Sequence, residues 1–450
     1  MKCLCCFLSA LFITLATMSA QDADYLWKVG ASRVDITPCD SVWMAGFASR
    51  TEPSAGVRMR IWAKALVLED AGGNAGLVVT MDVLSIPKPF SDRIRRYVQD
   101  KYGLPPSQVI LNSSHTHSGP VVGDALYYIY PMDETYRQVA RAYEEMLVRK
   151  TRDVIDEAFA SRAPARLSTG SGFARIAVNR RHNPPSPPPT LTLQGPSDYS
   201  VPVLKAERPD GTVRAVLFGY SCHATTLFDN YISGDYPGYA QQEVENLFPG
   251  AMAMFFQGCG ADQNPLPRGH VSQAVQYGRQ LAASVGQVLS EELKPLPSLF
   301  RACYREIPIR FDESLPRKEL ESMSGRDDFM GAWAKGMLGQ MDRGVPFPET
   351  YPYPVVCWKL GDQVVLALGG EVSSGYSIML KERYGQDLIV MGYCNDVMSY
   401  IPTAELWHEG GYETDDACKV YNLHARWTPE LEKAIMDGIG EMMEEINKGK

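Results

Sequence analysis

Two histidines separated by a single residue, His115 and His117, are the first residues of this sequence whose types and spacing suggest chemistry. On an extended backbone, residues two positions apart project from the same face, so both imidazoles can reach one metal ion or one substrate. The chain has only seven histidines, and two of them fall in this motif. We therefore expect the pair to be functional rather than structural.

His223 and Glu371 are candidates to complete a metal site with His115. Two imidazoles and one carboxylate, with the remaining position open to water, form a common catalytic zinc centre. Zinc lowers the pKa of bound water from about 15.7 towards 7, so such a centre provides hydroxide at neutral pH. Taken alone, His223 would fit a structural core histidine equally well. The sequence lacks other zinc signatures, among them His-Glu-x-x-His.

These candidate residues share a position, because each follows a short apolar run. In open α/β sheets, ligands bind outside the carboxyl ends of the strands, so turns of this kind are expected to converge on one site. Five runs are followed by polar, glycine-rich turns: 109–111 by 112–120, 216–218 by 219–223, 254–256 by 257–265, 366–368 by 369–371, and 388–390 by 391–396.

Strands and helices alternate in the predicted pattern, which favours an α/β fold. Val57–Leu68 and Gly76–Asp82 are predicted strands, and Gly72-Gly73-Asn74 between them is typical of a hairpin. Apolar residues recur at helical spacing between Tyr136 and Phe159 and between Ala274 and Val288. Further short strands are expected at Gln108–Leu111, Val213–Phe218, Ala251–Phe256, Val364–Leu368 and Leu388–Met391.

The first 20 residues are typical of a signal peptide, with Lys2 before the apolar run Leu4–Ala16 and cleavage expected before Gln21. We therefore expect a secreted or periplasmic protein. The mature chain has no apolar run of the roughly 20 residues that a membrane-spanning helix needs. Residues 21–450 show no Gly/Ser linker and no repeat, so we expect one domain. Asn183–Pro189 is expected to be a loop, and residues 313–354 a lid-like insertion.

Charge and cysteine content limit the possible partners and crosslinks. The net charge of −9 disfavours a nucleic-acid partner, which would require a basic face. Seven cysteines remain after the signal segment, so at least one thiol is unpaired. Cys357 and Cys394 flank the proposed site and are candidates for a disulfide. Nothing in the sequence indicates an oligomeric state.

From His115-Thr-His-Ser-Gly-Pro120 onward, the chain resembles the neutral/alkaline ceramidase family, and the resemblance extends through most of the mature chain. It implies mixed β-sheets flanked by helices, and a ceramidase-like hydrolase of an amide bond in lipid metabolism, with ceramide, a sphingolipid, as the family substrate. Further motifs that resemble the family are Val34–Pro38 with Met44–Phe47, Arg60–Ala65, Asn179-Arg180, Gly234–Tyr239, Gly370-Glu371 and Gly411–Glu413.

The resemblance also implies roles for individual residues. His115, His223 and Glu371 would hold Zn²⁺, and His117 would lie beside the metal. Arg180 would orient the polar group of the substrate. Tyr412 would donate a hydrogen bond to the oxyanion, an interaction typically worth about 3 kcal/mol of barrier.

The sequence departs from the family pattern at three places. The family has a Ser in a Gly-Asp-Val-Ser-Pro-Asn segment, whereas Gly258–Asn264 has Ala261 or Asp262 at that position. Asp262 or His117 would then handle protons, although an Asp in such a turn is often only a turn residue. The family's tyrosine ligand is expected near Val397, and Tyr400 matches a second family tyrosine. The fourth ligand is therefore water, Asp396 or Tyr400. The family's C-terminal β-sandwich domain is expected to be absent, because the chain ends at Lys450.

Three functions are compatible with these patterns. The first is a zinc-dependent amidase that attacks an N-acyl group with zinc-activated water. The second is an esterase or glycan-directed hydrolase on the same scaffold, and the third is a catalytically inactive binding protein. A long apolar groove would favour a lipid amide. A polar cleft lined by aromatic residues such as Tyr351 and Trp333 would favour a sugar.

Overall fold

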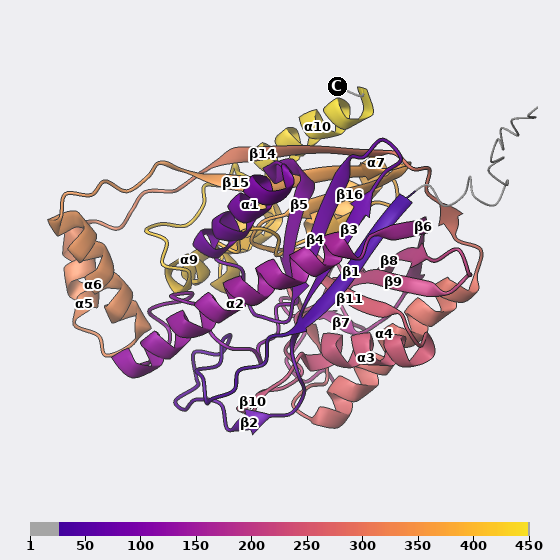
Figure 1. Cartoon of the computed structure of the whole chain (residues 1–450). Coiled ribbons are helices and arrows are strands. Elements are labelled where there is room, and N and C mark those ends of the chain that lie inside the picture. Colours follow the sequence, from indigo (N-terminus) through magenta and orange to yellow (C-terminus); the bar gives the residue numbers. More distant parts are fainter. Residues whose placement is uncertain (1–26, 449–450) are drawn as a thin grey trace, which may run out of the picture.

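Two β-sheets pack face to face, and helices cover both outer faces (Figure 1). The computed structural model describes residues 27–448, so the predicted signal segment at 1–20 lies outside the described residues. The larger sheet has nine strands, eight of them in the order β11-β9-β8-β6-β1-β3-β4-β5, with β13 paired to β6. The smaller sheet has the order β14-β15-β16-β18. Both sheets mix parallel and antiparallel pairs.

The strands of the two sheets have the following bounds. The larger sheet comprises β1 Trp27–Asp35, β3 Trp62–Glu69, β4 Ala75–Met81, β5 Val109–Ser113, β6 Ala163–Phe173, β8 Ser200–Glu207, β9 Val213–Tyr220, β11 Met252–Gln257 and β13 Lys294–Pro295. The smaller sheet comprises β14 Phe300–Arg310, β15 Thr350–Leu360, β16 Gln363–Leu368 and β18 Ile389–Met391. Short pairs outside these sheets are β2 Gly56–Val57 with β10 Tyr231–Ile232, β7 Ala177–Asn179 with β12 Gln263–Pro265, and β17 Glu371–Val372 with β19 Tyr400–Ile401.

Helices cover the sheets because their apolar faces match the outward side chains of the strands. On the larger sheet these are α1 Lys88–Tyr102, α2 Glu134–Ala160, α3 Asp235–Leu247 and α4 Val271–Ser290. On the smaller sheet they are α7 Ser374–Tyr384 and α10 Leu431–Lys448. The remaining helices are α5 Arg317–Ser324, α6 Phe329–Asp342, α8 Ala404–Glu409, α9 Ala417–Val420, the 3₁₀ turn η2 Pro106–Gln108 and the π-helical turn η3 Tyr412–Asp416.

Most predicted elements are present. The hairpin joins β3 to β4 in antiparallel register, and Asp70 stabilises its turn by accepting a hydrogen bond from the Asn74 amide at 2.8 Å. Both predicted helices form, as α2 and α4. The predicted strand Val57–Leu68 is instead divided into β2 and β3, because residues 56–57 pair with β10 rather than with the main sheet. In the predicted lid-like insertion, α5 and α6 form a lobe at one side of the molecule (Figure 1).

One side chain brings the two ends of the larger sheet together. β5 and β11 are the first and last strands of the order, yet Asn112 at the end of β5 bridges them. Its side-chain oxygen accepts from the Gln257 amide of β11 at 2.9 Å, and its Nδ2 donates to the Gly392 carbonyl at 2.7 Å. The sheet therefore curls, and the turns after β5, β11 and β18 meet.

The predicted pairing of Cys357 with Cys394 is wrong. All seven cysteines of the described residues are free. Cys357 lies in β15 directly opposite Cys303 of β14, whereas Cys394 follows β18, on the far side of β16. Cys394 accepts a hydrogen bond from Asn112 instead.

A buried ion pair attaches α7 to the larger sheet. Lys381 of α7 donates to Asp198 at 2.6 Å, and both side chains are less than one-tenth exposed. Ser377 donates to the same carboxylate at 2.7 Å. Because α7 begins three residues after Glu371, this contact fixes the segment that carries the candidate metal ligand.

We expect Asp198→Asn to lower the free energy of unfolding by about 3–5 kcal/mol, because it leaves the buried Lys381 ammonium without a counter-ion. Burial would raise the pKa of Asp198, but Lys381 outweighs burial and holds that pKa below its ordinary value. The stabilisation is therefore complete above about pH 4 and is lost as the pH falls below that value. Urea unfolding checks this, with the exposed Asp210→Asn as control. A cost below about 1 kcal/mol would contradict it.

Candidate metal centre and active site

Two imidazole nitrogens and one carboxylate oxygen meet where strands of both sheets end. His115 follows β5, His223 follows β9, and Glu371 opens β17. Nε2 of His115 and Nε2 of His223 each lie 3.2 Å from Oε2 of Glu371. All three side chains are buried, with at most 3% of each exposed.

Backbone carbonyls fix the tautomer of both imidazoles. Nδ1 of His115 lies 2.8 Å from the Leu84 carbonyl, and Nδ1 of His223 lies 2.8 Å from the Gly260 carbonyl. A carbonyl oxygen can only accept, so each Nδ1 carries the proton and donates it. In the neutral imidazole, Nε2 is then a bare lone pair that points at Glu371. Histidines that bind metals are usually oriented in this way.

This donor set fits a metal cation. With the proton on Nδ1, each imidazole turns its Nε2 lone pair towards Oε2 of Glu371, 3.2 Å away, and a cation can bind all three atoms. Protonated imidazoles would remove the repulsion, but burial, with a contribution from Arg180, lowers the pKa of His223 to about 4. A tetrahedral ion with bonds of about 2.0–2.1 Å holds neighbouring ligand atoms about 3.3–3.4 Å apart. The observed spacing lies just below this value.

The loops that carry the two histidines are joined by main-chain contacts. Thr116 and Ala224 form a parallel bridge, and the His117 amide donates to the Ala224 carbonyl at 3.1 Å. His115 has a φ of 55°, a left-handed conformation that is uncommon for a residue other than glycine. Such backbone conformations cluster at functional sites, where the surrounding structure holds them in place.

Two tyrosines hold the Glu371 carboxylate. The Tyr421 hydroxyl donates to Oε1 at 2.5 Å, and the Tyr393 hydroxyl donates to Oε2 at 3.4 Å. Both hydroxyls donate to the carboxylate, so it is oriented towards the two imidazoles and can serve as a ligand for a cation.

His117 lies beside the three candidate ligands. Its Nε2 is 3.1 Å from Nε2 of His115, and its ring packs at 4.8 Å on Phe47. Burial, followed by the neighbouring His115 and His223, lowers the pKa of His117 well below its ordinary value, so the ring is neutral. Its Nδ1 is buried without a hydrogen-bond partner in the described structure. The imidazole is thus available to accept or donate a proton.

Arg180, Tyr400 and Tyr412 form the opposite side of the site. The Tyr400 hydroxyl lies 3.4 Å from Nε2 of His223, and Nη2 of Arg180 donates to it at 3.2 Å. Tyr400 is opposite Glu371 in the β17–β19 pair, which explains how the two side chains meet. The Tyr412 ring lies 5.4 Å from the Tyr400 ring. The residue as a whole is 44% exposed, while burial around the hydroxyl raises the pKa of Tyr412, so the phenol is protonated and can donate a hydrogen bond.

Two acidic candidates lie outside this cluster. The Asp262 carboxylate accepts from the Ser374 amide and hydroxyl at 2.7 and 2.8 Å, and from Asn179 at 3.3 Å. Its main-chain carbonyl accepts from the Arg180 amide at 2.8 Å. Asp262 therefore braces the segment that carries Arg180. Asp396 accepts from Tyr351 in a separate cavity, so of the two protein residues considered as fourth ligand only Tyr400 reaches the imidazoles.

Sequence reasoning missed three residues of this site: Tyr393, Tyr421 and Glu413. Glu413 accepts from Arg180 and from Arg181, both at 2.9 Å, and so fixes the turn that carries Tyr412. It was visible in the Gly411–Glu413 motif as a neighbour of a candidate residue. Tyr421 and Tyr393 carry no local signal, because they meet Glu371 only through the packing of distant segments.

Comparisons with known proteins agree with this geometry. The family model for the N-terminal part of neutral/alkaline non-lysosomal ceramidases matches residues 27–341. The neutral ceramidase of Pseudomonas aeruginosa is 25% identical over 497 residues, which cover 94% of this chain and 72% of that protein. In the described residues, no helix is long and apolar enough to cross a membrane.

Two solved structures share the fold. A neutral ceramidase from Pseudomonas aeruginosa superposes with a TM-score of 0.70 at 20% identity, over 92% of this chain and 73% of that one. A ceramidase complexed with C2 gives a TM-score of 0.71 at 21% identity, over 92% of this chain and 74% of that one. The predicted α/β fold of mixed sheets flanked by helices is therefore confirmed.

We expect the purified protein to bind about one divalent metal ion per chain, and His223→Ala to lose it, because one of three converging ligands is removed. Elemental analysis by mass spectrometry measures the metal. His408→Ala is the control, since His408 is exposed on α8. Metal retained by the His223 variant, or absent from the unmodified protein, would contradict the assignment.

Proposed function

Because this chain belongs to the neutral/alkaline non-lysosomal ceramidase family, we propose that it is a zinc-dependent hydrolase that cleaves the N-acyl bond of an amide substrate. The observation that carries the proposal is the convergence of His115, His223 and Glu371 on one point, with Nδ1 of both imidazoles donating to backbone carbonyls and both Nε2 atoms facing the carboxylate. In keeping with the predicted signal segment, we propose that it acts outside the cytoplasm.

The residues that would hold zinc are His115, His223 and Glu371, with Tyr400 within reach as a fourth ligand. When bound, zinc acidifies a water molecule towards a pKa of about 7 and polarises a carbonyl oxygen. Tyr421 and the Leu84 and Gly260 carbonyls keep the donors aligned, so little reorganisation is required.

The chain's own side chains would then guide the acyl group. We place the carbonyl oxygen of the substrate near the Tyr412 hydroxyl, which has no hydrogen-bond partner in the described structure. A donor at that position stabilises the negative charge that develops on the oxygen. Arg180, held by Glu413, adds positive charge on the same side of the site.

His117 would move the proton between nucleophile and leaving amine. The ring is neutral, its Nε2 lies 3.1 Å from Nε2 of His115, and its Nδ1 has no hydrogen-bond partner among the described residues. A general base must lie within hydrogen-bond reach of the group it deprotonates, and a water on a metal held by His115 would lie close to His117. Asp262 is assigned to positioning, since its carboxylate is already occupied by Ser374 and Asn179.

An apolar acyl group is favoured by the residues outside His117. Phe47 packs on His117 at 4.8 Å and on Phe228 at 5.3 Å, and Phe228 is 45% exposed. These rings lead from the site to the surface and offer apolar contact. Trp333, in contrast, is buried and donates to the Leu423 carbonyl, so it does not line a sugar-binding cleft.

Activity on paired substrates tests the proposal. We expect the zinc-loaded protein to hydrolyse a chromogenic medium-chain N-acyl amide, to lose this activity after chelation, and to regain it on addition of zinc. The matching O-acyl ester measures the alternative esterase activity. Faster turnover of the ester alone would favour an esterase, and turnover of neither, with zinc bound, would favour a binding protein.

Gly46→Ala tests the role of His117. Gly46 has a φ of 103°, and a Cβ there would lie 2.4 Å from Nδ1 of His117, so the imidazole must move. We expect kcat to fall at least tenfold while zinc content is unchanged. Gly73→Ala is the control, because φ is 84° and nothing lies within 4 Å of the added carbon. If both substitutions lowered kcat equally, backbone strain alone would explain the loss of activity, and the proposed role of His117 would be contradicted.

A further inference from the structure

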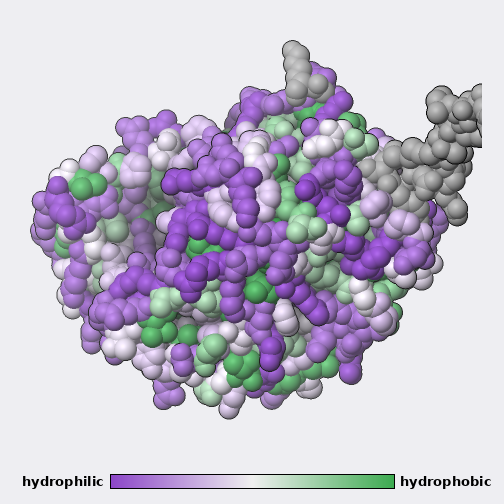
Figure 2. All heavy atoms as spheres, in the orientation of Figure 1, coloured by the Kyte–Doolittle hydropathy of each residue, from purple (hydrophilic) through white to green (hydrophobic). Residues whose placement is uncertain are grey.

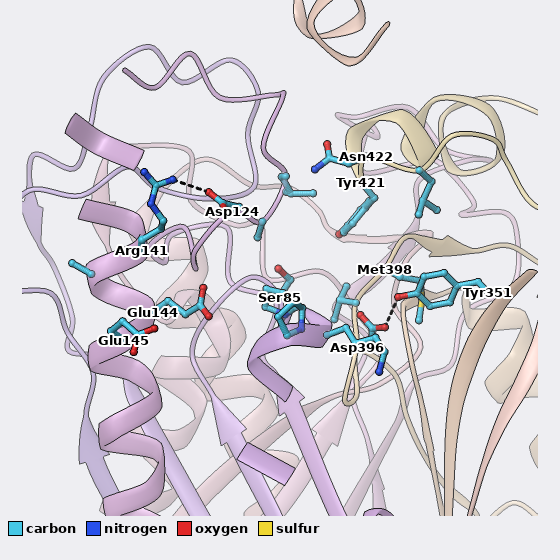
Figure 3. A pocket seen from close by; sticks show the side chains of 18 residues that line it. Ser85, Asp124, Arg141, Glu144, Glu145, Tyr351, Asp396, Met398, Tyr421 and Asn422 are labelled. Atoms are coloured by element: carbon cyan, nitrogen blue, oxygen red, sulfur yellow. Dashed lines mark hydrogen bonds and ion pairs between the residues drawn. The ribbon is translucent and has the colours of Figure 1, made fainter. Parts of the chain in front are cut away.

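A cavity of about 640 Å³ lies next to the metal centre, and none of His115, His223 and Glu371 lines it (Figure 3). Segments from α1, α2, the loop at 124–126 and the turns at 396–398 and 421–423 form its walls. Tyr421 belongs to both places, because its ring lines the cavity and its hydroxyl donates to Glu371. A molecule in the cavity would therefore contact a side chain that holds the metal centre.

One carboxylate in this cavity lacks a cation. Four acidic residues line the walls, and three of them are paired: Asp124 with Arg141, and Glu144 and Glu145 with Arg93. Asp396 has no ion pair within the described chain, although only 5% of it is exposed. Figure 3 shows its side chain beside the Tyr351 hydroxyl, which donates to Oδ2 at 2.6 Å and is its only hydrogen-bond donor among the described residues.

The charges around Asp396 compensate its negative charge only in part. Lys88 lines the same cavity, but its ammonium lies 3.1 Å from Asp92, to which it is paired. Burial raises the pKa of Asp396 to about 6, because it outweighs the Tyr351 hydrogen bond and the Lys88 charge, which lower that pKa. At neutral pH the carboxylate is therefore mostly ionised and poorly solvated. A buried charge in this state gains most from a cationic partner that also donates hydrogen bonds.

Apolar side chains form another part of the wall. Leu126, Val397, Met398 and Leu423 line the cavity, and Met398 lies close to Asp396 in Figure 3. A bare metal ion gains nothing from such a surface, whereas an organic cation can bury carbon against it. An anion is disfavoured, because acidic residues outnumber basic ones on the walls.

We propose that this cavity binds an organic ammonium ion, with the amine on Asp396 and the carbon skeleton against Leu126, Met398 and Leu423. Two classes of molecule carry such an ammonium group, alkylamines and amino sugars. Both have the positive charge, but the first has an alkyl chain and the second a sugar ring. The assignment does not require the proposed hydrolase activity, since the cavity is separate from the metal ligands and its occupancy is measurable without turnover.

Isothermal titration calorimetry of the full chain at pH 7.5 tests the assignment with hexylamine against hexan-1-ol, and with glucosamine against glucose. We expect one amine to bind at least tenfold more tightly than its neutral counterpart, a difference of about 1.4 kcal/mol. Asp396→Asn should weaken the binding of that amine at least tenfold. If hexylamine binds more tightly than hexan-1-ol, the ligand is an alkylamine, and if glucosamine binds more tightly than glucose, it is an amino sugar.

Two further variants keep the result decisive. Glu145→Gln makes the same change of charge at the rim and should leave binding unchanged, because Glu145 is already paired with Arg93. Ala125→Trp fills the cavity and should abolish binding, which provides the answer if the Asp396 variant does not fold. The proposal is overturned if neither amine binds, if alcohol and amine bind equally, or if the Asp396 and Ala125 variants bind like the unmodified protein.

Discussion

The repulsion among three acceptors at one point is the constraint on which the rest of the structure depends. Nε2 of His115 and Nε2 of His223 each face Oε2 of Glu371 at 3.2 Å, and at most 3% of each side chain is exposed. Burying a charged carboxylate is costly unless it is paired. Tyr421 and Tyr393 donate to the carboxylate, but the Leu84 and Gly260 carbonyls hold both imidazoles in the tautomer that turns Nε2 towards it. A metal cation bound between the three side chains would remove this conflict.

The fold supplies this point by bringing distant strand ends together. Asn112 joins the first and last strands of the larger sheet, so the turns after β5 and β11 lie side by side. The β17–β19 pair then places Glu371 next to Tyr400, and the buried Lys381–Asp198 pair secures α7 behind it. Each contact involves only a few side chains, but together they fix the positions of the three candidate metal ligands. The left-handed backbone at His115 is retained under these restraints.

Sequence alone predicted the parts of the site that follow strands. His115 and His223 each lie in the turn after an apolar run, the residues Gly72-Gly73-Asn74 identified the hairpin, and the 3.6-residue period identified α2 and α4. The same reasoning missed β1 and β14, whose buried and exposed residues do not alternate cleanly. It also merged β2 with β3 into one strand, since the sequence gives no break there and only pairing with β10 separates them. Tyr421 could not be predicted, because its contact with Glu371 spans 50 residues and arises from packing.

Anomalous diffraction at the zinc edge, from crystals of the purified protein, would locate the metal. We expect one strong anomalous peak within about 2.0–2.2 Å of Nε2 of His115, Nε2 of His223 and a carboxylate oxygen of Glu371. A peak at another position, or zinc-loaded crystals with no peak between these three side chains, would contradict it.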